Sequence, residues 1–555
     1  MPDGRNLIFT FILVSSLFFL WAICNGMIDV MDKHFQTELG LSKSQSAWVQ
    51  FAHYLGYFLM SLPAGMLASR FGYKWGIIAG LLMVAAGGFW FLPATHFNTL
   101  ARAGSLSPTT AFVGYLAGVC AIAAGLTFLE TVANPYTTVL GPKQYAATRI
   151  NLAQSCNGAG WIFGPIIGAI FFYSKDDSGR STGNETLYIP YVTVAIVVLV
   201  LAVVFYFANI PDVKTEDDYG LDEDDGAVEG EAAERKVNRV PVYFLMLMNS
   251  AVLVGVFAMI LSLILSAANY SQSIVWIASG MLFAGAAVAL VPIAKKISHH
   301  SVWTHPHFSS ATLAQFFYVA AQAGIFSFFI NSMTSDPKTG FSMVPPIPAS
   351  WDQAMTNISS SARHFVESLP HWLGWAIQWL PGWLLGWFET NKYGVLCISD
   401  KGAANLASLA FVWFLIGRFS GACLLSKVSA HKILGFYGIM NVIACFLVFL
   451  NLGWFSVVCI FLSYFFMSIM FPTIFALGIY GLGARAKKAS GFIVMAIMGG
   501  AILPKLMGAV ADKYDMSRGY IVPLFCFAFV AFYGYCWPKL SKAEGLHVVK
   551  NAGGH

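Results

Sequence analysis

Long apolar runs alternate with short polar stretches along nearly the whole chain. A run of about 20 residues is enough for one helix to cross the roughly 30 Å hydrocarbon core of a bilayer. The pattern therefore predicts fourteen transmembrane helices. They are expected near residues 7–31, 45–68, 76–96, 108–140, 150–173, 187–210, 241–268, 273–293, 310–332, 404–425, 433–453, 456–482, 490–511 and 521–538.

The spacing of these runs divides the chain into two blocks of six helices and an added pair. An acidic stretch with few aromatic residues follows the first block, and it carries too little apolar surface to fold alone. We therefore expect an all-α polytopic membrane protein with two six-helix bundles and an extra transmembrane hairpin. The predicted domains are a first bundle at 1–210, a cytoplasmic linker at 211–240, the hairpin and a basic loop at 241–306, a second bundle at 307–540 with a long external loop at 333–403, and a cytoplasmic tail at 541–555.

The composition agrees with this pattern. The chain is 57% hydrophobic and 11% charged, and its mean hydropathy is +0.67, values that exclude an ordinary soluble protein. Strong helical hydropathy also argues against a β-barrel. The net charge of +5 is spread over loops and does not indicate nucleic-acid binding, and the nine cysteines give no disulfide framework.

Lysine and arginine give the expected orientation. They are concentrated in the loops that are cytoplasmic if the N-terminus is cytoplasmic, as the positive-inside rule requires. We expect both termini in the cytoplasm, a first span that is retained, and a plasma membrane location, which is the inner membrane in a Gram-negative bacterium. The three N-x-S/T sequons, at Asn184, Asn269 and Asn357, then lie outside, although they do not establish glycosylation.

The long external loop contains tryptophans at steps of three and four residues, which place them on one helical face. Because Trp favours the membrane interface, we expect a helix on the outer leaflet, broken or bent at Pro381. Anchoring is favoured over a role as a lid or a partner site. The residues are Trp372, Trp375, Trp379, Trp383 and Trp387.

Polar residues inside the predicted spans cluster at helical spacings. Such residues are expensive in hydrocarbon and mark transport paths, although amides also join helices by hydrogen bonds of about 0.6 to 2 kcal/mol. The clusters are Asn25 with Asp29, Gln50 with His53, Glu130 with Asn134, Asn151 with Gln154 and Asn157, and Gln315 with Tyr318 and Gln322.

Glu130 is the strongest candidate for a functional residue, because it lies in the middle of a long apolar span with no Lys or Arg in the spans of its block. A buried carboxylate in such a place is stabilised by taking up a proton. Asp29 is the second candidate, with the reservation that Asp32 and Lys33 follow it and place it near the outer water. For His53 a helix-packing role is favoured over a functional one, and Arg418 is expected to snorkel or pair near the cytoplasmic end.

Motifs of enzymes are missing from the sequence. It contains no Gly-rich phosphate loop, no H-E-x-x-H and no cysteine pair at zinc spacing, so we expect neither enzymatic activity nor a cofactor. The histidines of the basic turn favour a solvated loop over a metal site. They are His299, His300, His305 and His307.

Several runs, among them SLFFLWAICNGMIDV, GLTFLETVANPYTTVLGP and RINLAQSCNGAG, resemble the L-fucose:proton symporter family of the major facilitator superfamily. The resemblance covers about 7–211 and 307–540 in register. It implies two six-helix bundles that rock about a central cavity. It also implies that Asp29 and Glu130 are the family's essential acids, and that Gln154 and Asn157 are cavity amides.

Two positions depart from that family. Asn25 and Gly26 stand where the family carries an Asn pair, and Phe471 replaces a cavity tyrosine. Lost hydrogen-bonding groups change which sugar is accepted, so fucose itself becomes doubtful. The extra hairpin and the Trp-rich loop have no counterpart in twelve-helix members.

These observations predict a proton-coupled symporter that imports a monosaccharide of the hexose or 6-deoxyhexose class by alternating access. Asp29 and Glu130 are expected to carry the proton. The alternatives are an amino-sugar symporter, a sugar uniporter and, from another class, a non-transporting sugar sensor. The expected partners are the sugar, the proton and the lipid bilayer, with the protein a monomer. The predicted substrate contacts are Asn25, Gln50, His53, Asn134, Gln154, Asn157, Gln315, Gln322 and Phe471.

Overall fold

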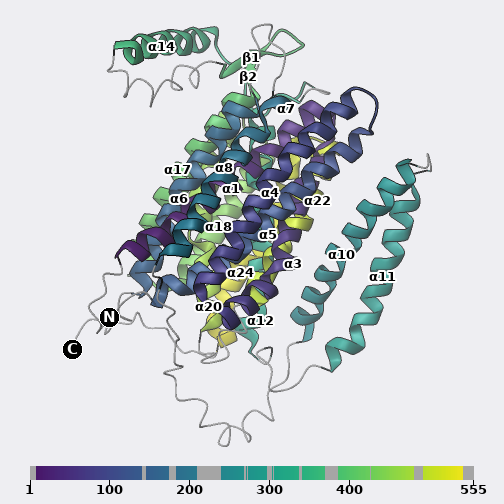
Figure 1. The fold of residues 1–555 in the computed structure, drawn as a ribbon, viewed down its shortest axis with the longest axis vertical. Coiled ribbons are helices and arrows are strands. Elements are labelled where there is room, and N and C mark those ends of the chain that lie inside the picture. Colours follow the sequence, from purple (N-terminus) through teal and green to yellow (C-terminus); the bar gives the residue numbers. More distant parts are fainter. Residues whose placement is uncertain are drawn as a thin grey trace, which may run out of the picture.

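The structure is a computed structural model, and its described part is almost wholly helical (Figure 1). The described residues are 8–139, 146–173, 183–208, 210, 239–267, 271, 273–296, 303, 305–336, 340–368, 386–425, 427–480 and 492–541.

The first half of the chain forms a bundle of six long helices. Helix α1 packs on α6, α3 and α4 both pack on α5, and α4 also packs on α8. The predicted span at 7–31 proves too short, because α1 continues for two more turns. The elements are α1 (Ile8–Leu39), α2 (Lys43–Ser46), α3 (Trp48–Phe71), α4 (Tyr73–Arg102), α5 (Pro108–Val139), α6 (Ala146–Phe171), α7 (Gly183–Thr186) and α8 (Tyr188–Phe207).

Two glycines allow α1 and α6 to cross closely. A Cβ placed on Gly26 would lie 3.1 Å from the Gly164 Cα, and one on Gly164 would lie 2.6 Å from the Gly26 Cα. Side chains at these positions would separate the helices. The crossing therefore explains why a glycine stands at 26, where the resembling family has asparagine.

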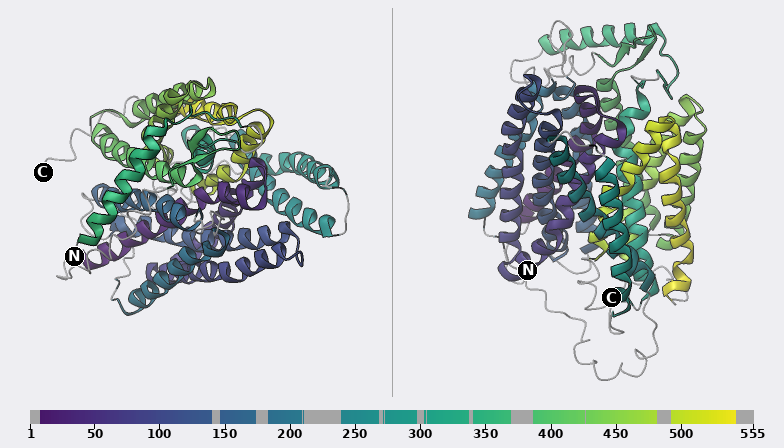
Figure 2. Two further views of the ribbon diagram at one scale, coloured as in Figure 1. Left: turned by 90° about the horizontal axis from the view of Figure 1, so that it is seen from above. Right: turned by 90° about the vertical axis from the view of Figure 1, so that its right-hand side faces the viewer.

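The second half forms a bundle beside the first (Figure 2). Helices α18 and α24 pack together, and α12 packs on α20, α22 and α24. The elements are α12 (Pro306–Ser327), α13 (Phe329–Met333), α17 (Asp400–Leu425), α18 (Ala430–Phe449), α19 (Trp454–Met467), α20 (Met470–Ile479), the 3-10 turn η4 (Ala496–Met498), α22 (Gly499–Lys513), α23 (Met516–Gly519) and α24 (Ile521–Ser541).

The inserted hairpin stands at the side of the two halves (Figure 2). It consists of α10 (Arg239–Ala267) and α11 (Ser273–Lys295). Helix α10 contacts α12, α22 and η4 of the second half, and Gly255 of α10 packs against the Phe51 ring of α3 in the first half. Most of α11 stays exposed, as expected for a helix facing lipid. The hairpin therefore lies along the seam between the halves.

The segment predicted as a long loop contains secondary structure. Helix α14 (Ala349–Ser368) lies across one end of the bundles, next to the antiparallel strands β1 (Phe388–Thr390) and β2 (Leu396–Ile398) (Figure 1). We call this end of the molecule the α14 end. Most of the Trp-rich helix predicted at 372–387 lies outside the described residues. Its last member, Trp387, lies in a bend before β1, so the prediction of helix is wrong there.

Eleven of the described helices are long and apolar enough to cross a membrane. The chain is a multi-pass membrane protein. The other long helices of the two halves are α3, α6 and α12, which carry Gln50, His53, Gln154, Asn157, Gln315 and Gln322. Counting them with the eleven gives the fourteen spans of the sequence prediction, which the structure fits.

Candidate functional site

Asp29 of α1 and Gln50 of α3 meet in the interior of the first half. Asp29 is 8% exposed and Gln50 is 1% exposed, and the Gln50 Nε2 donates a 3.0 Å hydrogen bond to Asp29 Oδ1. The other carboxylate oxygen, Oδ2, has no hydrogen-bond partner among the described residues. The expectation that Asp29 lies near the outer water is therefore wrong. Helix α1 extends past it, and the second half covers it.

Asp32 is a site residue that the sequence reasoning missed. It lies one turn after Asp29 on α1 and is completely buried. Its carboxylate lies beside Gln50 and beside Ser327 of α12, without a fully formed hydrogen bond to either. The signal was present in the sequence, since Asp29 and Asp32 have helical spacing, but the predicted span ended at residue 31.

Glu130 faces Tyr57 across the α3–α5 contact. The Trp21 Nε1 donates a 2.7 Å hydrogen bond to the Tyr57 hydroxyl, so the hydroxyl proton of Tyr57 is free to point at Glu130. Asn25 lies beside the same hydroxyl, and its Nδ2 donates a 2.9 Å hydrogen bond to the Trp21 carbonyl oxygen. Tyr57 thus joins a predicted acid and a predicted amide. Sequence reasoning did not single out Trp21 or Tyr57, because both look like ordinary aromatic residues of a span.

His53 packs between tyrosine rings. Its ring centroid lies 4.9 Å from that of Tyr54 and 5.1 Å from that of Tyr57, and its Nδ1 has no hydrogen-bond partner among the described residues. This surrounding fits a packing role, and it leaves one ring nitrogen for a ligand. Asn134 lies on α5 one turn beyond Glu130, but its side chain and that of Pro135 lie outside the described part.

Arg418 of α17 reaches across the two halves to α6. Its Nη1 donates to the Gln154 carbonyl oxygen at 3.1 Å and to Asn157 Oδ1 at 3.5 Å, while its Nε lies 3.5 Å from the Ser468 carbonyl oxygen. Arg418 therefore pairs at the interface between the halves instead of snorkelling, and its place near the cytoplasmic end stays a prediction. The break between α19 and α20 exposes a carbonyl oxygen that holds the guanidinium at the interface.

The second half contributes fewer polar groups. Gln315 of α12 is completely buried, and neither atom of its amide group has a hydrogen-bond partner among the described residues. The Tyr318 hydroxyl donates a 2.9 Å hydrogen bond to the Met467 carbonyl oxygen. The centroid of its ring lies 6.5 Å from that of Phe471. Gln322 is partly buried. A buried amide without partners is a group that a hydroxylated ligand could satisfy.

Aromatic rings line the interface between the halves. Trp161 of α6 stacks on Phe411 of α17 at 4.9 Å and contacts Phe326 of α12 at 5.6 Å. Phe326 in turn stacks on Tyr464 at 4.6 Å, and Trp161 meets Trp21 at 6.0 Å. The sequence gives no signal for this cluster, because an aromatic residue facing the interface looks the same as one facing lipid.

Ion pairs join the two halves at the α14 end. The Lys33 Nζ lies 3.6 Å from Asp400 Oδ1, and the Lys43 Nζ lies 2.6 Å from Asp336 Oδ2 and 4.0 Å from Asp512 Oδ1. We call these five residues the latch. Beside the latch, Asn331 Nδ2 of α13 donates a 2.6 Å hydrogen bond to Gln36 Oε1 of α1. The halves are therefore closed against each other at this end.

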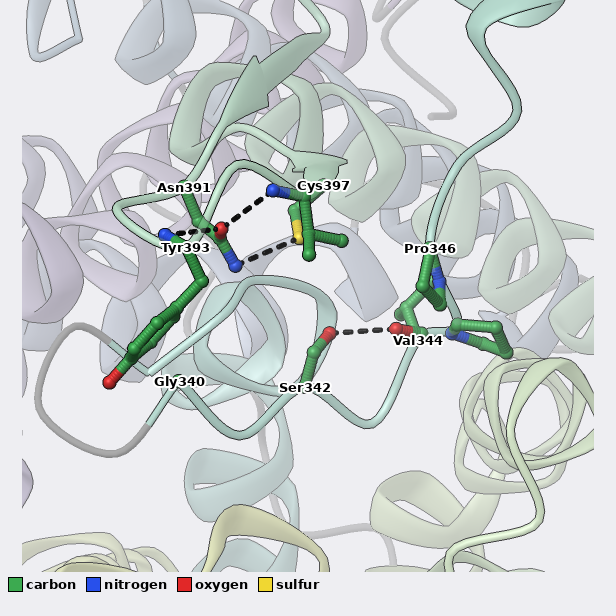
Figure 3. A pocket seen from close by; sticks show the side chains of 9 residues that line it. Gly340, Ser342, Val344, Pro346, Asn391, Tyr393 and Cys397 are labelled. Atoms are coloured by element: carbon green, nitrogen blue, oxygen red, sulfur yellow. Dashed lines mark hydrogen bonds between the residues drawn. The ribbon is translucent and has the colours of Figure 1, made fainter.

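A cavity of about 460 Å³ lies at the α14 end, outside the helix interface (Figure 3). Its polar groups are largely occupied by local contacts. Asn391 Oδ1 accepts from the Tyr393 and Val395 amides, and the Ser342 hydroxyl donates to the Val344 carbonyl oxygen. None of the predicted sugar contacts lines this cavity.

The histidine turn gives no metal site in the described part of the chain. His299 and His300 lie outside the described residues. The rings of His305 and His307 lie 5.7 Å apart, and the His307 Nε2 lies 2.9 Å from the Tyr480 carbonyl oxygen. His307 is thus engaged in holding α12 to α20.

Relatives of known name align with nearly the entire chain. A glucose/galactose transporter of Brucella abortus is 25% identical over 538 residues, covering 96% of this chain and 95% of the relative. The L-fucose-proton symporter of Escherichia coli is 29% identical over 530 residues, covering 95% and 93%.

Solved structures share the fold. The E. coli fucose:proton symporter matches with a TM-score of 0.54 and 26% identity, covering 96% of this chain and 99% of that one. A D-xylose-proton symporter matches with a TM-score of 0.53 at 11% identity, covering 96% and 98%, a likeness of fold alone. The sequence pattern of the Major Facilitator Superfamily matches residues 10–369. Together with the paired helical halves, this match shows that the chain belongs to the Major Facilitator Superfamily.

Proposed function

We propose that this protein is a proton-coupled symporter that carries a monosaccharide of the hexose or 6-deoxyhexose class across the plasma membrane. The observation that carries the proposal is the presence of two acids in the first half, the buried Asp29 and the partly buried Glu130, which have no ion-pair partner among the described residues. Relatives named for the transport of glucose and galactose, or of fucose with a proton, support the substrate class.

The acids are suited to carry the coupling proton. A carboxylate in a low-dielectric interior is stabilised by protonation, which removes its charge. Tyr57 is placed to donate a hydrogen bond to Glu130 when the carboxylate is ionised. We propose that protonation of Glu130 permits closure around the sugar, and that loss of the proton on the cytoplasmic side resets the carrier.

The amides and rings of the interface are suited to hold a sugar. Hydroxyl groups are recognised by amide donors and acceptors, and the apolar faces of a pyranose pack on aromatic rings. The proposed contacts span both halves, so that the sugar holds them together in the closed state. They are Asn25, Gln50, His53, Asn134, Gln154, Asn157, Gln315, Gln322 and Phe471, with Trp161 added from the structure.

The latch then lies on the external side, and both termini lie in the cytoplasm. This orientation follows from the excess of Lys and Arg in the loops opposite the α14 end. In this orientation, the closed latch shuts the external entrance of the carrier.

Transport by purified protein in liposomes tests the proposal. D-glucose, D-galactose and L-fucose are first compared by thermal shift, since a ligand that binds only the folded state raises the melting temperature. The sugar that binds is then used for net uptake and for counterflow exchange. Glu130→Gln is expected to lose net uptake driven by a pH gradient and to retain counterflow, because exchange needs no proton cycle. Net uptake by this variant at the wild-type rate would overturn the role of Glu130.

A further inference from the structure

We propose that Asp29 and Asp32 form a carboxyl pair that shares a single proton while the latch is closed. The inference rests on the proposed proton-coupled function and adds a second acid to its machinery. The pair lies on one face of α1, since residues three apart on a helix are neighbours.

Burial and missing partners set this pair apart. Asp29 is 8% exposed and Asp32 is 0% exposed, and three of their four oxygens have no hydrogen-bond partner among the described residues. Gln50 Nε2 donates to Asp29 and also lies beside Asp32, so one amide group contacts both carboxyls. The Ser327 hydroxyl donates instead to the Ala323 carbonyl oxygen. Asp32 is thus a buried acid with no hydrogen-bond partner among the described residues, and it lies one turn from Asp29 on the same helix.

No cation neutralises the pair among the described residues. The nearest lysine in sequence, Lys33, is itself 3% exposed and is paired with Asp400. The other titratable groups that face the two acids are phenols, which are neutral at physiological pH. They are Tyr54, Tyr191 and Tyr464 toward Asp29, and Tyr173 toward Asp32.

Electrostatics favours one proton in the pair over none. Two carboxylates in a weakly polar interior repel each other strongly, and like-charged acids in one site ionise in separate steps. Uptake of one proton from water forms one O–H bond, leaves a single negative charge, and allows a hydrogen bond from one carboxyl to the other. The Gln50 amide then donates to the remaining charge.

The position of Asp32 connects this proton to the contact between the halves. Asp32 lies beside Ser327 of α12 and next to Lys33 of the latch. When the latch opens, α12 moves from α1 and water reaches Asp32. The pair then exchanges its proton with the external solution, whereas the closed latch seals it.

Infrared titration of the protein without sugar tests the proposal. Protonated buried carboxyls give a C=O band that disappears on ionisation, and the pH of half-disappearance is measured in the wild type, Asp32→Asn and Asp29→Asn. Either single variant is expected to lose its remaining proton at a pH lower by about one unit or more, a tenfold fall in proton affinity, because the neighbouring charge is gone. Glu130 gives its own contribution to the band, so the component that is absent from the double variant is assigned to the pair.

The matched control is Glu38→Gln, which removes an acid from the same helix that is already paired with Arg102 at 2.9 Å. The pH at which its C=O band is half lost is expected to equal that of the wild type. If both single variants keep the wild-type midpoint, the two acids titrate independently and the shared proton is ruled out. Should one single variant fail to fold, the other decides alone. The readout needs no sugar, so its failure is distinct from a failure of sugar-coupled transport.

Discussion

At the scale of single residues, Gly26 links local packing to the choice of substrate. The resembling family carries an amide at this position, and this chain has no room for one because α6 passes within contact of the Gly26 Cα. The first half therefore offers Asn25 alone on this turn of α1. A sugar that needs both amides is therefore expected to bind this protein less well.

Gly26→Asn is predicted to destabilise the protein by about 1 to 3 kcal/mol, because an overpacked helix crossing must separate. Thermal unfolding of the purified protein measures the effect. The matched control is Gly280→Asn on α11, where a Cβ would meet nothing within 4 Å. Equal melting temperatures for the two variants would contradict the tight crossing.

Tyr57→Phe tests the contact between Glu130 and its neighbour. Without the hydroxyl, ionised Glu130 loses a hydrogen-bond donor and holds its proton to higher pH. The pH at which net sugar uptake is half-maximal is therefore expected to rise. Tyr54→Phe, on the same helix, is the control and should leave that pH closer to the wild-type value. No change in Tyr57→Phe would show that the hydroxyl does not interact with the acid.

At the residue level, sequence patterns single out residues of unusual chemistry and overlook residues of common types. Asp29, Gln50 and Glu130 stand out because polar groups are rare in spans, and the structure places them inside the first half. Trp161 and Tyr57 were missed, since hydropathy does not tell a ring at the interface from a ring facing lipid.

At the scale of elements, the apolar pattern finds helices well and their ends poorly. Helix α1 runs through Asp32 and Lys33 to Leu39, because Asp400 pairs with Lys33 and the second half buries the turn that looks polar in sequence. Helix α14 escaped prediction for a related reason. Its amphipathic pattern is that of a surface helix and gives no apolar run.

The contact between α3 and α22 includes a partly buried lysine. The Lys505 Nζ lies 3.3 Å from the ring centroid of Trp48 and 5.9 Å from that of Trp276 on α11. A cation over an aromatic face contributes about 0.5 to 2 kcal/mol, and the attraction falls with distance. This lysine, which has no clear role in the sequence, therefore joins the two halves and reaches toward the hairpin.

Double-mutant cycles are predicted to give a larger coupling energy for Trp48 with Lys505 than for Trp276 with Lys505. The cycles use Trp→Leu and Lys505→Met, and free energies of unfolding are measured in detergent. The cycle cancels the effects that each substitution has whether or not its partner is also substituted. A larger value for Trp276 would contradict the assigned contact.

At the scale of the whole molecule, the latch holds the halves together at the α14 end. Its five charges come from segments far apart in sequence, so no pattern along the chain reveals them. Only the fold brings Lys43 to Asp336 and Asp512. The two-bundle fold itself was predictable, because the number and length of the apolar runs and the resemblance to a symporter family agree with it.

Lys43→Gln is predicted to open the α14 end. The Lys43 ammonium group then no longer bridges Asp336 and Asp512, and loss of this charged contact between the halves favours their separation. Distances between spin labels placed on α2 and α22 are expected to lengthen. Arg102→Gln is the control, since its partner Glu38 belongs to the same half. Unchanged distances in Lys43→Gln would mean that the latch does not govern closure.

Counting protons that move with sugar tests the central claim most directly. Wild-type protein in liposomes without a starting gradient is given the sugar that binds, and the external pH is recorded. We predict that sugar entry raises the external pH, because each transport cycle carries a proton inward. Glu130→Gln is predicted to show no such rise while it still exchanges labelled sugar. Sugar entry with no pH change in the wild type, or an unchanged proton-to-sugar ratio in Glu130→Gln, would contradict proton coupling through this acid.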